Sequence, residues 1–488
     1  MLGGRYQPLD AHEIERVHQT VLDVLENIGM ADPIPILEEC ALAKGCRINE
    51  HGRLCFPRGL VEDVIAHAGK AITWHGRDPR HDLDLSGKRV HTYGGGEAVN
   101  VLDVGASHYR PSTLVDIYDF ARLVDRLEHV HAFSRLVVAT EQSDLLVCDI
   151  NTAYASVAGT QKHTALTFAS AEHVDPTLQM LHMMAGGEKQ FAERPFCHGG
   201  GCPIISPLRY GQDNSEVCVE STKFGSPVWA VMAPQAGATA PAALAGALVQ
   251  VIAETLAALM LVDLVVPGYP VILGPWPFVS DLRTGSFTGG SGEEAVLSAA
   301  AAQVINHYGL VSSVGAGMTD AKSPDNQAGY EKGITVALAA LAGCNNVSES
   351  AGMMGSLMGC SFESLVIDND MLASVLRTVR GIEITDETLS YDIINDVVHG
   401  EGHYLRQPQT LALMRSEYTY PELADRGSPS DWEDEGSPDI RKRAGERVRS
   451  LLESHYPEYI EPDLDRKIRE HFPIVLAPED MRPGNGRW

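Results

Sequence analysis

The chain has 488 residues, of which 44% are hydrophobic, and a formal net charge of −27. These values indicate a globular protein with a large core and exclude a disordered chain. The negative charge argues against binding to nucleic acid or to an anionic membrane surface, since both require a basic protein surface. A cationic small molecule or a basic partner would be attracted.

The N-terminal residues contain no apolar h-region, which argues against a secretory signal. Nine cysteines are scattered without a repeating frame, which is typical of a reduced, cytoplasmic protein. The longest apolar stretch, Ala236 to Val266, is broken by one proline and by polar residues. We therefore expect a buried helix there and no membrane span.

Residues 1–88 are expected to form an N-terminal cap region of helices and short strands. Asp10 and Glu13 form a capping-box pattern ahead of apolar residues at helical spacing, and Gly29 follows as a stop. A second helix is expected near residues 33–44. Residues 45–90 are typical of short strands and turns.

Residues 89–385 alternate between short apolar runs and segments of helical length and spacing. The eight runs are HTYGGGEAVNVLD, VHAFSRLVVAT, KHTALTFAS, PFCHGGGCPII, PVWAVMAP, PVILGPWPFV, LVSSVGAGMTD and NNVSESAGMM. Eight strand–helix units predict a (β/α)8 TIM barrel, an α/β fold. Residues 386–488 are more charged, and we expect a C-terminal helical extension that packs on the barrel or on a neighbouring subunit.

In such a barrel, functional residues lie at the carboxyl ends of the strands. This rule places the polar loop Gly315 to Gly333, which contains Asp320, Lys322 and Gln327, at the barrel mouth. The other candidates, in chain order, are Glu97, Asn100 and Asp103; Thr140, Glu141 and Gln142; Thr167 and Ser170; His198; Met232 and Gln235; Trp276, Phe278, Asp281 and Arg283; Glu349 and Ser350.

Structural roles compete with these functional ones. The glycines at 199–201 are also typical of turns that need a positive φ. Trp276 and Phe278 stand two residues apart, on one side of an extended segment, and are equally typical of a core. Asp320 and Lys322 would also suit a mutual ion pair or the cap of the next helix.

The nearest pattern to a metal site is Cys197 and His198 with Cys202. A catalytic zinc site needs three ligands at regular spacing and an open position, and this pattern lacks such spacing. Nucleophile motifs such as GxSxG are absent. We therefore expect no metal on this chain.

Several segments resemble the trimethylamine methyltransferase family. The signature region of that family is similar to TDAKSPDNQAGYEK preceded by NHYGLVSSVGAGM, and its fifth-strand loop and helix are similar to PQAGATAPAALAGALVQVIAETLA. RPSTLVDIYDFARLVDRLEHV resembles its first barrel helix, and GHYLRQPQTL its post-barrel segment. The resemblance runs from about Gly94 to Arg415 and implies a (β/α)8 barrel.

The resemblance also implies a reaction. Members of the family move a methyl group from an amine to the cobalt(I) of a separate corrinoid protein, which docks at the barrel mouth and carries the cobalamin, so no cofactor is expected on this chain. The founding branch uses pyrrolysine, whose position would lie near Met318 to Pro324, but this chain has only standard residues. It therefore resembles the branch that demethylates quaternary amines such as glycine betaine and related betaines.

A quaternary nitrogen has no N–H and is held by aromatic faces and nearby negative charge. Candidates for the faces are Tyr93, Trp276, Phe278 and Tyr330, and candidates for the charge are Glu97 and Asp320. A betaine carboxylate needs a donor, for which Lys322, His198, Gln235 and Arg283 are candidates. We expect Glu97, Asp320 and Lys322 to be catalytic and the others, with Asn100, Thr319, Gln327 and Ser350, to bind substrate.

Three other functions stay open. One is a barrel enzyme with a thiolate-bound zinc at Cys197, His198 and Cys202 that performs methyl transfer or lyase chemistry. Another is a noncatalytic betaine-binding protein, and the last is a scaffolding subunit. Large soluble enzymes are commonly symmetric, so a homo-oligomer is expected.

Overall fold

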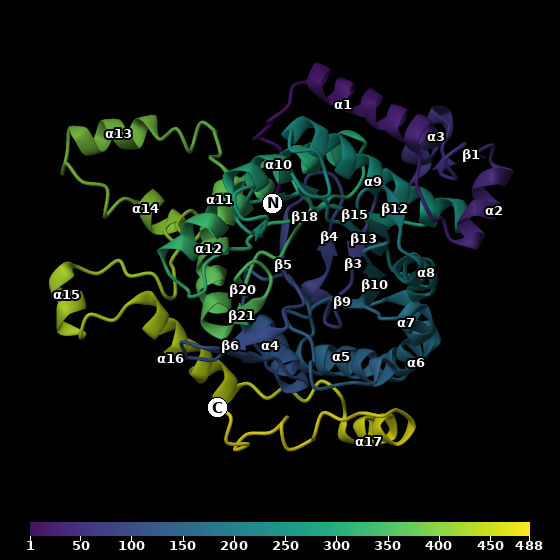
Figure 1. The fold of residues 1–488 in the computed structure, drawn as a ribbon. Helices are drawn as coiled ribbons and strands as arrows, with labels where there is room; N and C mark the ends of the chain where they lie inside the picture. Colours follow the sequence, from purple (N-terminus) through teal and green to yellow (C-terminus); the bar gives the residue numbers. More distant parts are fainter.

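A closed barrel of eight parallel strands lies at the centre of the computed structural model, which describes residues 1–488 (Figure 1). The strands are β5 (His91–Gly94), β8 (Ala132–Ser134), β9 (Thr164–Thr167), β10 (Cys197–Gly201), β13 (Val228–Met232), β15 (Val271–Pro275), β18 (Ser313–Gly315) and β19 (Asn346–Ser348). They neighbour each other in chain order, β19 pairs with β5, and a parallel bridge between Leu273 and Ser312 closes the ring. The predicted (β/α)8 barrel is confirmed.

Helices follow the strands and surround them (Figure 1). They are α4 (Leu114–Arg126), α5 (Leu145–Gly159), α6 (Val174–Ala185), α7 (Glu188–Glu193), α8 (Gln212–Glu220), α9 (Leu244–Val265), α10 (Gly292–His307), α11 (Asn326–Ala342) and α12 (Phe362–Arg380), with 3-10 turns η3 (Ala171–His173) and η4 (Ser221–Phe224). The strands are buried on both faces by side chains inside the barrel and by helices outside it, which explains their continuous apolar runs.

Short strands between the barrel strands and their helices build up the mouth. One sheet has the order β20 (Met353–Met354), β21 (Gly359–Ser361), β6 (Asn100–Leu102), β7 (Tyr109–Pro111). A second joins β14 (Gln235–Ala236), β16 (Phe278–Ser280) and β17 (Phe287–Thr288). A hairpin of β11 (Ile204–Ile205) and β12 (Arg209–Tyr210) follows β10. The runs at 91–103 and 270–279 therefore each contain a barrel strand followed by a mouth strand.

The N-terminal region packs on one side of the barrel and beneath it. It contains α1 (Ala11–Asp23), the π-helical η1 (Val24–Ile28), α2 (Pro35–Ala43), β1 (Arg47–Ile48), β2 (Leu54–Cys55), α3 (Arg58–His67), β3 (Thr73–Trp74), η2 (Pro79–His81) and β4 (Leu83–Asp84). The predicted capping box is present: the Asp10 N–H donates to Glu13 at 2.9 Å, and the Glu13 N–H donates to Asp10 at 2.8 Å. Trp74 inserts from below and stacks on His163 and His198.

Helix α9 is long and apolar enough to cross a membrane by length and composition alone. In the fold, 83% of its most apolar window is buried. It packs against α1, α2, α3 and α10 and against strands β13 and β15. The helix therefore has the surroundings of a buried core helix, as its polar interruptions indicate.

The C-terminal region divides into an arm and a strap. The arm, residues 382–437, contains α13 (Tyr391–Val398), α14 (Pro408–Leu413) and α15 (Pro429–Asp434), which lie outside the ring of barrel helices (Figure 1). The strap, residues 438–488, contains two helices. Helix α16 (Ile440–Ser454) packs on α12 and α4, and α17 (Pro462–His471) contacts α6.

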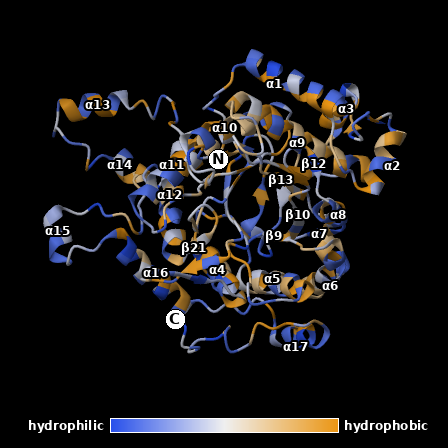
Figure 2. Ribbon diagram, viewed as in Figure 1, coloured by the Kyte–Doolittle hydropathy of each residue, from blue (hydrophilic) through white to orange (hydrophobic).

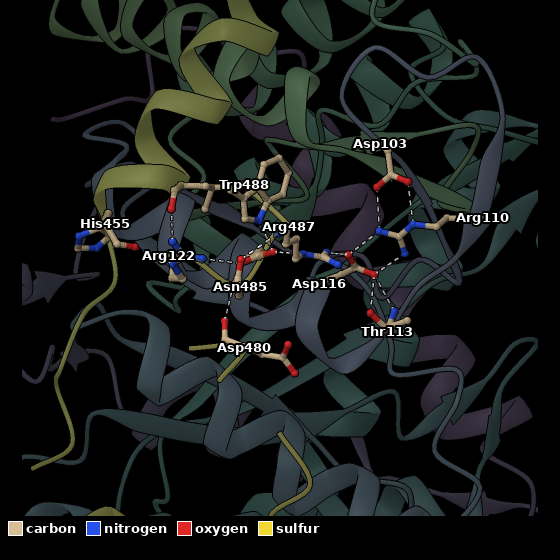
Figure 3. Close-up of polar contacts among 12 residues, drawn as sticks. Asp103, Arg110, Thr113, Asp116, Arg122, His455, Asp480, Asn485, Arg487 and Trp488 are labelled. Atoms are coloured by element: carbon tan, nitrogen blue, oxygen red, sulfur yellow. Dashed lines mark hydrogen bonds and ion pairs between the residues drawn. The ribbon is translucent and has the colours of Figure 1, made fainter. Parts of the chain in front are cut away.

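The last residues tie the strap to α4 (Figure 3). Arg487 forms ion pairs with Asp116 and Asp119, and the Trp488 indole N–H donates to Asp119 at 2.7 Å. Arg110 forms a further ion pair with Asp116, with Nη1 2.7 Å from Oδ2. These two α4 carboxylates are completely buried, and each is compensated by arginine, which burial of a charge requires.

Candidate functional site

A cavity of about 520 Å³ lies at the carboxyl ends of the barrel strands. Its wall combines residues from or just after seven of the strands: Gly96, Glu97, Ser134, Arg135, Thr167, Phe168, Gly201, Cys202, Trp229, Val231, Trp276 and Glu349. Gln142 from the loop before α5 and Asn214 from α8 also line it. Two other hollows of comparable size, beside Tyr154 and beside Arg377, lie among outer helices and loops. Only the cavity at the carboxyl ends of the strands lies where barrel enzymes have their active sites.

One wall of the cavity is aromatic. The rings of Trp229 and Trp276 lie 5.7 Å apart in an edge-to-face arrangement. Both indole N–H groups donate to Ser313, one to its hydroxyl and one to its carbonyl, at 3.2 Å each. A Cβ at Gly315 would lie 2.9 Å from the Trp276 ring, so the glycine of the VGAG run allows this close approach. The two indole rings are thus fixed in position.

Another part of the wall carries an ion pair between Glu97 and Arg135. Glu97 accepts from Arg135 Nη2 at 2.9 Å and from the Thr167 hydroxyl at 2.6 Å. Burial raises the pKa of Glu97, but the charge and hydrogen bond of Arg135 outweigh it and hold that pKa below its usual value. Glu97 is therefore ionised at neutral pH. Arg135 Nε is buried without a hydrogen-bond partner.

Glu349, directly after β19, is a further carboxyl group of this cavity wall, to which α5 also contributes Asp149. Its side chain is 1% exposed, and Oε2 is buried without a hydrogen-bond partner. Burial, and then the charge of Glu97, raise its pKa to about 8. The two glutamates therefore differ in charge at neutral pH.

Of the residues predicted for the site, Glu97 and Trp276 line the cavity. Tyr93 lies buried in the barrel interior, with its ring 6.3 Å from that of Trp229, and Ser350 donates to the Tyr93 carbonyl at 3.0 Å. Phe278 packs behind Trp276, with ring centroids 5.9 Å apart. These three residues support the cavity from below and behind.

The loop after β18 uses its polar groups mainly on itself. Glu331 of α11 accepts from the Thr319 hydroxyl, from the Asp320 N–H at 2.9 Å and from Gln327 at 2.9 Å. Asp320 accepts from the Gly289 N–H at 2.8 Å. Asp325 caps α11 by accepting from the N–H groups of residues 327 and 328.

Four other predicted residues also lie away from the cavity wall. Lys322 is exposed and donates to the Asp320 carbonyl, so it forms no ion pair with the Asp320 carboxylate. The Arg283 side chain is 89% exposed and pairs with Asp281, and Tyr330 is 64% exposed on α11. Asn100 donates to the Met358 carbonyl at 2.9 Å in the mouth sheet.

Gln235 and His198 also make contacts that do not involve the cavity. Gln235 accepts from Ser280 at 3.2 Å, behind the wall. His198 is fully buried below the cavity, stacked on Trp74, with Nδ1 2.8 Å from His163 Nε2. Burial and then the neighbouring His163 hold its pKa well below the usual value, so His198 is neutral.

The residues of the alternative zinc site do not converge. Adjacent residues on a strand point to opposite faces, so Cys197 lies in the core outside the barrel strands whereas His198 points inside. Cys202 lines the cavity alone. No group of three or more His, Cys, Asp or Glu side chains in the chain is arranged to hold a metal ion.

Sequence reasoning missed Arg135 and Trp229. The strand run VHAFSRLVVAT was interpreted as extending to residue 140, whereas β8 ends at Ser134, so the strand-end rule selected residues 140–142. Trp229 is an inward-facing residue within its strand, and a rule that considers only strand ends does not find it. Glu349 was selected by position but was given no role.

A closed (β/α)8 barrel with an aromatic and charged cavity at the carboxyl ends of its strands is the architecture of a barrel enzyme. The chain belongs to the trimethylamine methyltransferase (MTTB) family, whose model matches residues 3–473. It is thus a methyltransferase of this family.

Two relatives and one solved structure illustrate the similarity. The chain is 32% identical over 469 residues to a trimethylamine methyltransferase MttB of Desulfitobacterium hafniense, covering 96% of this chain and 93% of the relative. It is 28% identical over 465 residues to a glycine betaine methyltransferase of another strain of that species, covering 95% and 96%. A crystal structure of the hydroxylamine MtmB complex is 12% identical, with a TM-score of 0.51 over 91% of this chain and 92% of that one, and supports the fold alone.

Proposed function

We propose that this methyltransferase moves a methyl group from a quaternary amine, glycine betaine or a related betaine, to the cobalt(I) of a separate corrinoid protein that docks at the barrel mouth. The observation that carries the proposal is the composition of the cavity wall, which combines two indole rings with the carboxyl groups of Glu97 and Glu349. A permanent cation without N–H groups is held by such faces and charges. The similarity to a glycine betaine methyltransferase, and the absence of any nonstandard residue, agree with this choice of substrate.

The carboxylate of a betaine needs a donor in the same cavity. Arg135 spends one nitrogen on Glu97 and keeps a buried Nε without a partner. Gln142 and Asn214 add amide groups to the wall. We assign the carboxylate to Arg135, because charge-assisted hydrogen bonds from arginine are the strongest available to it. Lys322 and Arg283, proposed from sequence for this role, are exposed outside the cavity.

The chemistry demands positioning more than activation. As the methyl carbon bonds to cobalt(I), the C–N bond breaks and its electron pair stays on nitrogen, so a neutral tertiary amine leaves and no proton is needed. The protein's task is to hold the N–CH3 bond in line with the incoming cobalt and to exclude water. Indole rings fixed by Ser313 and a wall anchored by the Glu97–Arg135 pair suit that task.

The test is a spectral assay. The protein is mixed with a reduced corrinoid protein, and quaternary and tertiary amines are added one by one while the absorbance of cobalt(I) and of its methylated form is followed. We expect methylation with a betaine. If no amine methylates the cobalt, although another methyltransferase can methylate the same corrinoid protein, the proposal is overturned. Metal content and equilibrium binding would then separate a zinc enzyme from a betaine-binding protein.

A further inference from the structure

Glu349 has no compensation for its burial. The other cavity glutamate, Glu97, has Arg135 and Thr167 as partners, whereas Glu349 Oε2 has none. A buried carboxyl oxygen without a partner is costly, and such groups persist where a ligand or a chemical role supplies what is missing. The location of Glu349 in the cavity wall makes a ligand the natural complement.

The backbone around Glu349 is arranged to hold the carboxyl in that place. Glu349 has a φ of 58°, in the left-handed region that a glutamate rarely adopts. Its carboxyl lies over two glycines: a Cβ at Gly95 would lie 3.0 Å from Oε1, and a Cβ at Gly96, whose φ is 124°, would lie 2.4 Å from Oε2. A strained residue seated on two glycines is typical of a functional position.

The charged and titratable groups around this carboxyl are mostly acidic. They are Glu97 and Tyr93 from β5 and its loop, Cys202 after β10, Cys360 on β21, and behind them the Lys332–Asp368 ion pair. The cavity's one arginine, Arg135, is held by Glu97. Burial and the charge of Glu97 raise the pKa of Glu349 to about 8, so the empty cavity holds a neutral acid there at pH 7.

We propose that Glu349 binds the positive charge of the substrate and gives up its proton to solvent when a quaternary ammonium enters the cavity. This inference rests on the proposed function and goes beyond it, because it names the group that recognises the cation. The O–H bond of the carboxyl breaks, the proton leaves to bulk water, and the carboxylate stays opposite the ammonium. The cavity then contains one new anion and one new cation.

Binding must therefore depend on pH in a defined direction. A cation lowers the pKa of Glu349, so binding below the free pKa of about 8 requires release of a proton, and affinity rises with pH. We expect Kd for a quaternary amine to fall about tenfold between pH 6 and pH 7 and to level off above pH 8. A neutral isostere, in which carbon replaces the ammonium nitrogen, should bind weakly and without this dependence.

Isothermal titration calorimetry of the full chain tests the inference without any corrinoid protein. Glycine betaine and tetramethylammonium are titrated at pH 7 in two buffers of different ionisation enthalpy, which gives the number of protons released. We expect about 0.9 proton per bound cation for the wild type, from the free pKa of about 8. Glu349→Gln should release none and bind more weakly at pH 8, while Glu349→Asp should keep part of the release.

Glu294 provides the matched control. It is also buried, its Oε1 also lacks a partner, and burial raises its pKa to about 8, but it lies at the start of α10 and outside the cavity wall. Glu294→Gln should leave the proton release unchanged. Tight binding of a betaine with no proton release by the wild type, or with undiminished release by Glu349→Gln, would overturn the inference and leave the proposed function standing. Failure of every quaternary amine to bind would overturn both.

Discussion

Trp276 is the aromatic residue whose removal tests the cavity most directly. Its ring forms part of the wall, and its N–H is held by the Ser313 carbonyl at 3.2 Å. A desolvated cation–π contact stabilises a bound cation by about 1–2 kcal/mol, so Trp276→Ala should raise the Kd of glycine betaine about tenfold. Calorimetric titration measures this. Phe278→Leu, behind the wall, should change Kd less than about threefold, and equal effects of the two variants would contradict the assigned wall.

At the residue scale, the strand-end rule found Glu97 and Trp276 because Trp276 directly follows β15 and Glu97 comes in the short turn after β5. The rule did not foresee that the loop after β18 satisfies its own groups. Glu331, which lies on α11 and is 12 residues after Thr319, accepts hydrogen bonds from Thr319 and Asp320, and no pattern in the sequence indicates that contact. Partners of this kind depend on three-dimensional proximity, which a single sequence does not contain.

At the scale of elements, the Lys162 side chain secures the end of α4 through its Nζ. Its Nζ is buried and donates to the carbonyls of Val124, Leu127 and Val130 at 2.6 Å each. Lys162→Met would leave three carbonyls buried without partners and should lower stability by about 3 kcal/mol or more. Calorimetric melting checks this, with Lys189→Met as the control, because the Lys189 side chain is 85% exposed. Equal melting temperatures for the two variants would contradict the role.

The same lysine predicts a pH effect. Burial lowers the pKa of Lys162 to about 7, so between pH 7 and about pH 10 the unfolded chain binds more protons than the folded one. The contribution of Lys162 to stability therefore rises with pH across that window. Lys162→Met removes the titrating group, and its melting temperature should increase less from pH 7 to pH 9 than that of the wild type. An identical pH dependence would show that Lys162 keeps its proton when folded.

The eight strands and their helices were predictable because a parallel strand buried on both faces is a continuous apolar run, and because helix spacing is regular. The mouth strands were not, since β14, β17 and β20 have two residues each and too little length to show an alternation. Pairs such as β21 with β6 join residues about 260 positions apart, and local pattern carries no information about them.

At the scale of the whole molecule, the arm formed by residues 382–437 is the part that the single chain leaves uncovered. Figure 2 shows hydrophobic residues along α13, which lies apart from the barrel. Thirteen large apolar side chains in it are exposed: Ile382, Ile384, Leu389, Tyr391, Ile394, Val398, Tyr404, Leu405, Leu411, Met414, Tyr418, Tyr420 and Trp432. Soluble monomers rarely expose so many in one region. Helices of six to eight residues are also too short to be stable alone.

We propose that a second copy of this chain covers the arm. Thirteen such side chains present roughly 1,000 Å² of apolar surface, which matches what each partner buries in a stable dimer. The arm lies beside the barrel (Figure 1), whereas the corrinoid protein of the proposed function would dock at the mouth and leave after each transfer. A transient partner would expose the arm for most of the time, so the cover must be permanent, and a copy of the chain is always present at matching concentration.

Light scattering coupled to gel filtration tests this assembly. The wild type should elute at a multiple of the chain mass of 52.7 kDa. The variant Ile394→Asp/Val398→Asp places two charges on the exposed apolar face of α13, and their desolvation cost should shift the mass towards that of one chain. Ile36→Asp, on the exposed face of α2, is the matched control and should leave the mass unchanged, because Ile36 is exposed but isolated from the arm. A measured wild-type mass of 52.7 kDa, the mass of one chain, would show that the arm is not the interface. An α13 variant with the same mass as the wild type would show the same.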